Sequence, residues 1–328
     1  MMNSMLPLTF FLFLLVCLVA AVPAVYLGVL SVLAYLSSRR YAMSGRFRAQ
    51  YTPSTQFLIL VPAHNEELLI GNLLQNLEQL SYPVDMYRVA VIADNCDDAT
   101  AEKARDNGVY VFERHDPENP GKGQALNWAM QNKLSELEFQ WQAVMVVDAD
   151  SELNSDFLDF MDAELQNGEQ VMQGYYGVQN PEASWRTSLL TIALSAFHYV
   201  RPLARNRLGF SCGLKGNGMC FSRELVERFG YPAFSAVEDV ELGMFYLMRD
   251  IRVRFVPGAQ VFGQMVSSAE EAEPQRVRWE KGRTEVTKTY LPKLLIHGIK
   301  ERNWAKLDGA LELLTPPFSV LCSITAFL

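Results

Sequence analysis

One long apolar run dominates the beginning of the chain. Residues 6–36 are almost wholly apolar, and no charged residue precedes Arg39. The run is longer than the roughly 20 residues that a helix needs to cross a bilayer core. A cleaved signal peptide is the alternative, but the run lacks a basic segment before it and is too long for a signal-peptide core. We therefore expect residues 1–38 to form an N-terminal transmembrane helix.

The middle of the chain alternates short apolar runs with helical patterns. Four runs have the composition of buried strands: residues 57–61, 89–93, 109–112 and 143–147. Leucines spaced three or four apart follow the first run, and a helix is expected from Gln124. This alternation predicts an α/β domain over residues 56–282 with a mostly parallel central sheet. In such sheets, ligands bind at the carboxyl ends of the strands.

Basic and apolar residues are interleaved towards the C-terminus. Between Lys281 and Lys306, seven basic residues stand against two acidic ones, and Pro292 interrupts the pattern. This predicts amphipathic helices over residues 283–310 that lie on anionic lipid. A solvated basic helix packed on the domain is the alternative. Residues 311–328 form an apolar membrane segment that is short for a span, so we expect either a re-entrant or interfacial segment or a truncated membrane region.

Charge supports the same division of the chain. The net charge is −8, from 29 basic and 37 acidic residues, which argues against a nucleic-acid partner. Four arginines make residues 39–55 a basic juxtamembrane linker, and the positive-inside rule places the next domain in the cytoplasm. We expect an integral protein of the cell (inner) membrane. The five cysteines and four histidines form no zinc-binding motif.

Several carboxylates stand where the predicted strands end. Asp148 and Asp150 follow the fourth strand, so both can reach one hard cation if the chain bends there. Oxygen ligands alone favour Mg²⁺ or Mn²⁺, which would bridge and neutralise a diphosphate leaving group. An ordinary strand-end turn is the alternative for this pair. Asp94, after the second strand, could accept hydrogen bonds from a base or ribose, or could cap a helix.

Three further features could contribute to a site. Lys122 lies in a glycine-rich loop that is not a P-loop, and it could reach a phosphate or could simply be solvated. Glu238 and Asp239 precede a helical pattern and could supply a general base, or could cap the helix. Gln275, Arg278 and Trp279 share one helix face, where the arginine could bind phosphate or the pair could be surface packing. Residues 185–201 read as an amphipathic packing helix with a structural histidine.

Taken together, the motifs resemble a known family. The order is Val61-Pro-Ala-His-Asn-Glu66, Asp94, Gly121-Lys-Gly-Gln-Ala-Leu-Asn127, Asp148-Ala-Asp150, Glu238-Asp239 and Gln275-x-x-Arg278-Trp279. This order is similar to that of membrane-bound family 2 glycosyltransferases, relatives of the cellulose, chitin and hyaluronan synthases and of ceramide glucosyltransferases. The resemblance covers about residues 57–283 and the flanking membrane segments.

The resemblance implies a GT-A fold and inverting transfer from a nucleotide-sugar, usually a UDP-sugar, to a lipid or saccharide acceptor. By position, it implies that Asp239 is the catalytic base and that Asp148 and Asp150 bind Mg²⁺ or Mn²⁺. The remaining implied roles are nucleotide-sugar binding by Asn65, Glu66, Asp94, Lys122 and Asp148, and acceptor or diphosphate binding by Glu238, Gln275, Arg278 and Trp279. Val237 stands where many synthases have threonine. The short C-terminal apolar run departs from polymerising relatives, and favours transfer of a single sugar or a truncated sequence.

Two other classes of protein compete with this interpretation. A sugar-phosphate nucleotidyltransferase would use a similar domain and release pyrophosphate, but it usually has a glycine-rich loop after the first strand, where this chain has Pro62-Ala-His-Asn65. A catalytically silent membrane subunit could bind a nucleotide-sugar without transferring it. The presence of both Asp239 and the Gln275, Arg278 and Trp279 face argues against that alternative.

Overall fold

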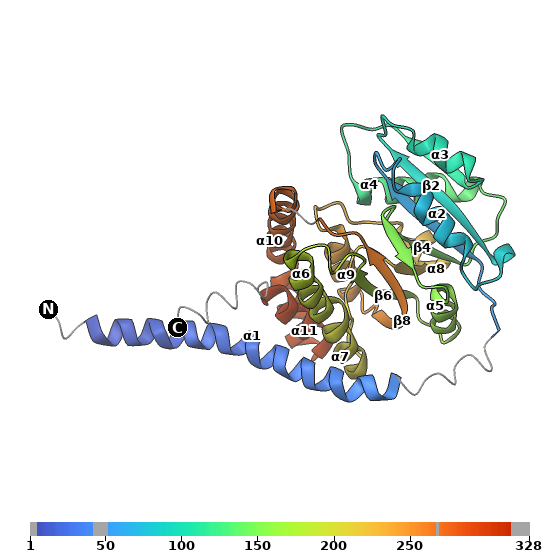
Figure 1. Cartoon of the computed structure of the whole chain (residues 1–328). Coiled ribbons are helices and arrows are strands. Elements are labelled where there is room, and N and C mark those ends of the chain that lie inside the picture. The colour runs from blue at the N-terminus through green and yellow to red at the C-terminus, as the bar shows by residue number, and fades with distance from the viewer. Residues whose placement is uncertain (1–4, 42–51, 267–268, 316–328) are drawn as a thin grey trace.

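The computed structural model describes residues 5–41, 52–266 and 269–315. One eight-stranded sheet, with helices on both of its faces, forms the body of the molecule (Figure 1). The strands are β1 (Phe57–Ala63), β2 (Tyr87–Asp94), β3 (Tyr110–Arg114), β4 (Ala143–Val146), β5 (Ser151–Leu153), β6 (Val171–Val178), β7 (Met219–Ser222) and β8 (Val253–Gly263). Their order across the sheet is β3-β2-β1-β4-β7-β6-β8-β5.

The helices fall into a domain set and an outer set. The domain set comprises α2 (Ile70–Glu78), η3 (Val84–Met86), α3 (Thr100–Asp106), α4 (Lys122–Asn132), η4 (Leu134–Glu136), α5 (Phe157–Gln166), α8 (Arg223–Phe229) and α9 (Glu238–Leu247). The outer set comprises α1 (Met5–Tyr41), α6 (Trp185–Ser195), the π-helix η5 (Ala196–Val200), α7 (Arg201–Leu208), α10 (Ala269–Lys300) and α11 (Trp304–Leu314).

The four strands predicted from apolar runs form the parallel part of the sheet. β3, β2, β1 and β4 are parallel neighbours, so their carboxyl ends share one edge. Side chains of β1 alternate between the faces: Leu58 and Leu60 join the core with α4, while Ile59 and Val61 join the core with α2 and α5. Burial on both faces explains why these runs are continuously apolar.

The sheet is mixed rather than mostly parallel. β4–β7, β6–β7 and β5–β8 are antiparallel pairs, and β6–β8 is a further parallel pair. The strand pattern of this second half is weak in the sequence, because β6 contains Gln173, Gly174 and Gly177 between its apolar residues. The helix predicted over residues 185–201 is divided between α6, η5 and α7. Trp185, Leu189 and Ile192 on one face of α6 are exposed, while Thr187 is buried and α6 packs against β6.

Helix α1 contains 37 residues, with Pro23 inside it. Among the described residues it is the one helix long and apolar enough to cross a membrane, within the window Ala21–Ser38. Leu30 and Ala34 are nevertheless buried against the domain, where α1 packs along α7. The first part of the helix extends away from the domain (Figure 1).

Helix α10 continues through Pro274 and Pro292, so Pro292 does not end the helix as the sequence pattern suggested. Val286 and Leu294 are buried in a small core shared with α9 and α11, and this packing offsets the hydrogen bond that a proline removes. Lys288 and Lys293 on the same helix are exposed. Of the predicted segment 311–328, residues 316–328 lie outside the described residues.

Candidate active site

The parallel strands deliver the predicted site residues to one edge of the sheet. Glu66 follows β1, Asp94 is the last residue of β2, and Asp148 and Asp150 follow β4. The antiparallel strand β7 begins at this same edge, because Val146 pairs with Met219. The loop before β7 is therefore part of the site.

The loop before β7 is bonded directly to the Asp148 turn. The Gly218 N–H donates to the carbonyl of Val146 at 3.0 Å, and the Asp148 N–H donates to Asn217 Oδ1 at 3.2 Å. Asn217 is fully buried, and its Nδ2 donates to Ser151 Oγ at 2.8 Å. These bonds fix the backbone on which the Asp148 and Asp150 carboxylates stand.

Lys122 joins the loop to the carboxylates. Its Nζ forms an ion pair with Asp148 and donates to the carbonyl of Gly216 at 2.6 Å. Burial works against the charged form, but Asp148, Glu238 and Asp239 together raise the pKa of Lys122. The next residue, Gly123, has no room for a Cβ, which would overlap the carbonyl oxygen of Ala233. This close approach brings the start of α4 beside the segment that leads to Glu238.

The acid pair Glu238 and Asp239 opens α9, rather than preceding the helix as the sequence pattern suggested. A Cβ placed on Gly216 would lie 3.5 Å from Asp239 Oδ2, so Asp239 and Lys122 contact opposite sides of the same glycine. Burial, followed by repulsion from Asp239, raises the pKa of Glu238 to about 7. Burial also raises the pKa of Asp239. A half-buried carboxyl with a raised pKa suits a general base.

The carboxylates at this edge outnumber the cations. Burial, and then repulsion from Asp150 and Asp148, raises the pKa of Glu66. Burial and Asp148 likewise raise the pKa of Asp150. Mutual repulsion in an oxygen-only donor set fits a hard divalent cation. In the described ranges, no three His, Cys, Asp or Glu side chains already stand together as a metal-binding group.

Asp94 and Asn65 are held by neighbours on the nucleotide side predicted from sequence. Arg114 donates to Asp94 Oδ1 at 2.6 Å, and Asn95 Nδ2 donates to the same oxygen at 3.2 Å. Within the part of the chain that the structure describes, Oδ2 of Asp94 receives no hydrogen bond. Asn65 has a φ of 57°, and its Oδ1 accepts from the Asp97 N–H at 2.9 Å. Asn65 therefore shapes the loop, while Asp94 keeps one oxygen available.

Gln275, Arg278 and Trp279 lie on α10, apart from the carboxylates. Arg278 is exposed and Trp279 is 44% exposed; neither makes a hydrogen bond or ion pair with any described residue. One turn later, a Cβ on Gly282 would lie 3.1 Å from Ala236 Cβ. The motif is thus close in space to the segment that enters the acid pair, although it does not contact the acids.

Sequence reasoning did not find several residues that support the site. Arg114 holds Asp94, and Asn217 holds the Asp148 turn. Tyr176 of β6 stacks on His198, with ring centroids 5.2 Å apart, and repulsion from Asp148 and Asp150 adds to the effect of burial in raising the tyrosine pKa. The glycines around Asn217 were the available signal, because they mark a close backbone approach. For Arg114 and Tyr176 the sequence carries no such signal.

Comparison with known proteins identifies related sequences. A family model described as "Glycosyltransferase like family 2" matches residues 53–282. Probable glycosyltransferase YdaM of Bacillus subtilis is 26% identical over 242 residues, which cover 71% of this chain and 56% of that protein. Beta-monoglucosyldiacylglycerol synthase of Trichormus variabilis is 29% identical over 253 residues, which cover 74% of this chain and 52% of that protein. The match thus spans about half the length of each of these relatives.

Solved structures share the fold. Mannosyltransferase PcManGT from Pyrobaculum calidifontis, in complex with GDP-Man and Mn²⁺, has a TM-score of 0.60 at 17% identity, covering 95% of this chain and 87% of that chain. S. aureus TarS 1-349, in complex with UDP-GlcNAc, has a TM-score of 0.50 at 17% identity, covering 73% of this chain and 66% of that chain. At these identities the likeness concerns the fold alone.

Proposed function

The chain belongs to glycosyltransferase family 2, and on that premise we propose that it moves a sugar from a nucleotide-sugar, a UDP-sugar, to a hydroxyl group of a lipid or saccharide acceptor. Transfer inverts the configuration at the anomeric carbon. The observation that carries this proposal is the half-buried edge of the sheet, where acids outnumber cations and where Lys122, Asp148 and Asp239 are grouped around Gly216.

The donor side is built from the ends of β1, β2 and β4. Asp94 Oδ2 accepts a hydrogen bond from the base or ribose, while Asn65 and Glu66 line the nucleotide. Lys122 binds the phosphate nearest to Asp148. Asp148 and Asp150 hold Mg²⁺ or Mn²⁺, which, when bound, neutralises the negative charge that develops on the departing diphosphate. Mn²⁺ in the PcManGT complex supports a divalent ion in this fold.

The acceptor side is built from α9 and α10. Asp239 takes the proton from the acceptor hydroxyl, whose oxygen attacks the anomeric carbon from the face opposite the diphosphate. Burial keeps the pKa of Asp239 raised, so that this carboxylate can accept the proton. Repulsion from Asp239 raises the pKa of the neighbouring Glu238. Gln275, Arg278 and Trp279 close over the diphosphate and the acceptor, which requires the exposed face of α10 to engage only when substrates are bound.

We also propose that the enzyme is an integral protein of the inner membrane, with residues 1–38 as the anchor and residues 56–282 in the cytoplasm. The apolar helix α1 and the exposed lysines of α10 support this placement. A membrane position suits a lipid acceptor. The name of the Trichormus relative, a glucosyldiacylglycerol synthase, points to the same acceptor class.

The test is to incubate the detergent-purified full chain with a panel of UDP- and GDP-sugars and Mn²⁺, and to analyse the products. The expected result is release of free UDP from one UDP-sugar, and faster release when an acceptor lipid is added. The matched control is Asp239→Asn, which should bind the same nucleotide without turnover. Pyrophosphate release would instead identify a nucleotidyltransferase, and the absence of any product with bound nucleotide would identify a silent subunit.

A further inference from the structure

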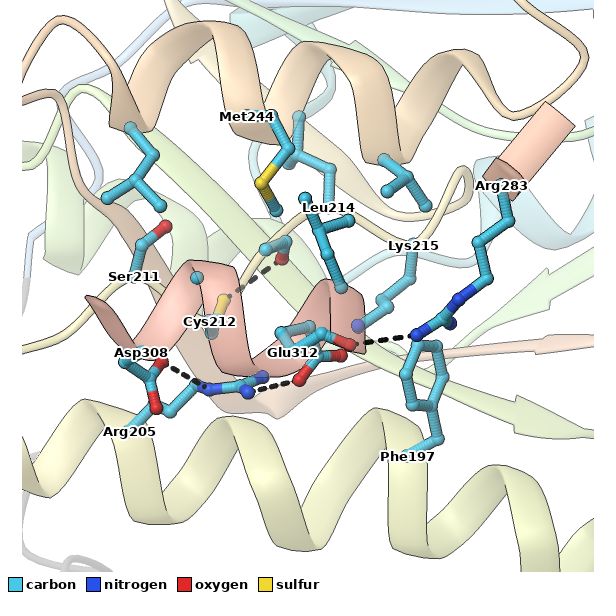
Figure 2. Close-up of a pocket in the computed structure, with 15 residues that line it drawn as sticks. Phe197, Arg205, Ser211, Cys212, Leu214, Lys215, Met244, Arg283, Asp308 and Glu312 are labelled. Carbon is cyan, nitrogen blue, oxygen red and sulfur yellow. Dashed lines mark hydrogen bonds and ion pairs between the residues drawn. The ribbon is translucent and has the colours of Figure 1, made fainter. Parts of the chain in front are cut away.

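A small cavity lies behind the acid pair, on the far side of the loop that carries Gly216. It is enclosed by this loop and by parts of α7, α9, α10 and α11 (Figure 2). Its volume of about 30 Å³ has room for about two water molecules or for one small polar group. Val240, the residue after Asp239, forms part of its wall. The cavity therefore adjoins the proposed catalytic base.

Lys215 is the feature of the cavity that points to a ligand. The residue is 8% exposed, and its Nζ lies 3.7 Å from the centre of the Phe197 ring. Its backbone N–H donates to Gln173 Oε1 at 2.8 Å, but no described residue forms a hydrogen bond or ion pair with the ammonium group. Burial lowers the pKa of Lys215 to about 8. Phe197 and the nearby charge of Glu312 stabilise the ammonium in part, but its buried N–H donors have no acceptor among the described residues, which suggests that they serve a ligand.

Two arginines near Lys215 also lack a carboxylate partner among the described residues. Arg201 is 8% exposed, and its guanidinium lies 5.2 Å from the centre of the same Phe197 ring. Arg283 donates from Nη2 only to the backbone carbonyls of Glu312 and Thr315, at 2.8 and 2.7 Å. Figure 2 shows Lys215 and Arg283 approaching Phe197 from the same side of the cavity.

The two carboxylates that line the cavity share one arginine. Arg205 Nε binds Asp308 at 2.8 Å, and its Nη2 forms an ion pair with Glu312. The hydroxyl of Tyr26 donates to Asp308 at 2.7 Å. Four cations, Arg201, Arg205, Lys215 and Arg283, therefore surround a cavity that is lined by two acids. Such surroundings attract an anion.

We propose that this cavity is an anion subsite of the acceptor site, and that it receives two oxygens of a phosphate group carried a few bonds away from the hydroxyl that Asp239 deprotonates. The proposal rests on the proposed function and specifies its acceptor as a phosphate-bearing molecule. Lys215 and Arg283 donate to the phosphate oxygens, and Arg201 adds positive charge behind Phe197. The negative charge of a phosphate matches the excess positive charge, and its several oxygens match donors that come from different segments.

Direct binding tests the subsite without turnover. Glycerol 3-phosphate, and glycerol as the neutral control, are titrated calorimetrically into the full chain in detergent. We expect glycerol 3-phosphate to bind and glycerol not to bind, and we expect Lys215→Met and Arg283→Met each to weaken binding at least tenfold. Lys133→Met is the matched lysine control, because Lys133 pairs with Glu136 on the surface. Arg88→Met is the matched arginine control, because Arg88 also donates to backbone carbonyls.

A second measurement separates a lipid phosphate from a soluble one. Donor consumption is followed in micelles that contain phosphatidylglycerol or diacylglycerol, and with soluble glycerol 3-phosphate. A lipid source predicts that phosphatidylglycerol accelerates consumption most, and that Lys215→Met raises the KM for this lipid while the KM for the donor changes less than twofold. A soluble source predicts the same pattern for glycerol 3-phosphate.

The outcomes decide the two proposals separately. If no donor is consumed with any acceptor, the proposed function fails, while calorimetry still decides the subsite. If glycerol 3-phosphate does not bind, or binds Lys215→Met and Arg283→Met as tightly as it binds the unaltered chain, the anion subsite is wrong. Unfolding of Lys215→Met is detected by its melting temperature, and binding to Arg283→Met then decides whether the subsite exists.

Discussion

The two sides of the loop before β7 carry opposite charge imbalances. On the β-strand side, burial and then repulsion between carboxylates raise the pKa values of Glu66, Asp150 and Glu238. On the helical side, burial lowers the pKa of Lys215. The loop between the two sides contains Gly213, Gly216 and Gly218, whose φ values are 72°, 83° and 67°. Each side carries an excess of one charge. We therefore expect a cation to bind on the acidic side and an anion to bind on the basic side.

The largest expected effect comes from withholding the cation from the acidic side. Excess EDTA should reduce sugar transfer to background, because the charge on the departing diphosphate then has no divalent ion to stabilise it. Transfer is measured as UDP release, and added Mn²⁺ should restore it. Activity that persists in excess EDTA would remove the metal role from Asp148 and Asp150.

The next effect comes from the base. Asp239→Asn should lower the rate of transfer about 10²- to 10⁴-fold, because an amide cannot accept the proton of the acceptor hydroxyl. Nucleotide binding, measured by calorimetry, should change little. The exposed Asp85→Asn serves as the control and should transfer at the normal rate. A variant at position 239 with full activity would exclude this aspartate as the base.

On the basic side, the largest effect should be on stability. Arg205→Met should cost about 3–5 kcal/mol of unfolding free energy, because it leaves Asp308 and Glu312 buried without their cation. Thermal unfolding of the detergent-solubilised chain measures this change. The combined variant R205M/D308N/E312Q should recover part of the loss. An unchanged melting temperature in Arg205→Met would mean that the three charges are solvated.

The smallest effect is a pH dependence that distinguishes the two sides. The folded-state pKa of Glu238, about 7, exceeds its ordinary value of 4.5, so the folded protein binds more protons and loses stability as the pH rises between these values. The folded-state pKa of Lys215, about 8, lies below its ordinary value of 10.5, so stability rises with pH between about 8 and 10.5.

The melting temperature of three proteins across this pH range tests these signs. Glu238→Gln should flatten the slope on the acidic side, and Lys215→Met should flatten the slope on the alkaline side, each by on the order of a few degrees. If both variants keep the slopes of the unaltered chain, neither Glu238 nor Lys215 causes the pH dependence of the melting temperature.

The sequence predicted the position of a polar residue correctly where that residue directly follows an apolar strand pattern. Continuous apolar runs identify β1, β2, β3 and β4, and a residue at the end of such a strand must lie at the shared edge. It was less informative about the second half of the sheet, because Gln173 and two glycines interrupt the apolar residues of β6 and the apolar run of β7 is only three residues long. The positive cavity was not predicted. The cations that line it come from positions 205, 215 and 283, and only tertiary packing brings them together.

Pro23 determines how α1 can bend. The helix is continuous from Met5 to Tyr41, but a proline lacks the N–H that would bond to the preceding turn, so the helix is least stiff at this point. Tyr26, which is fixed to Asp308, comes three residues later. A change in the tilt of the first part of α1 is therefore absorbed at Pro23 before it reaches the Tyr26 contact. In the proposed membrane placement, a bend at Pro23 leaves the contact between Tyr26 and Asp308 in place.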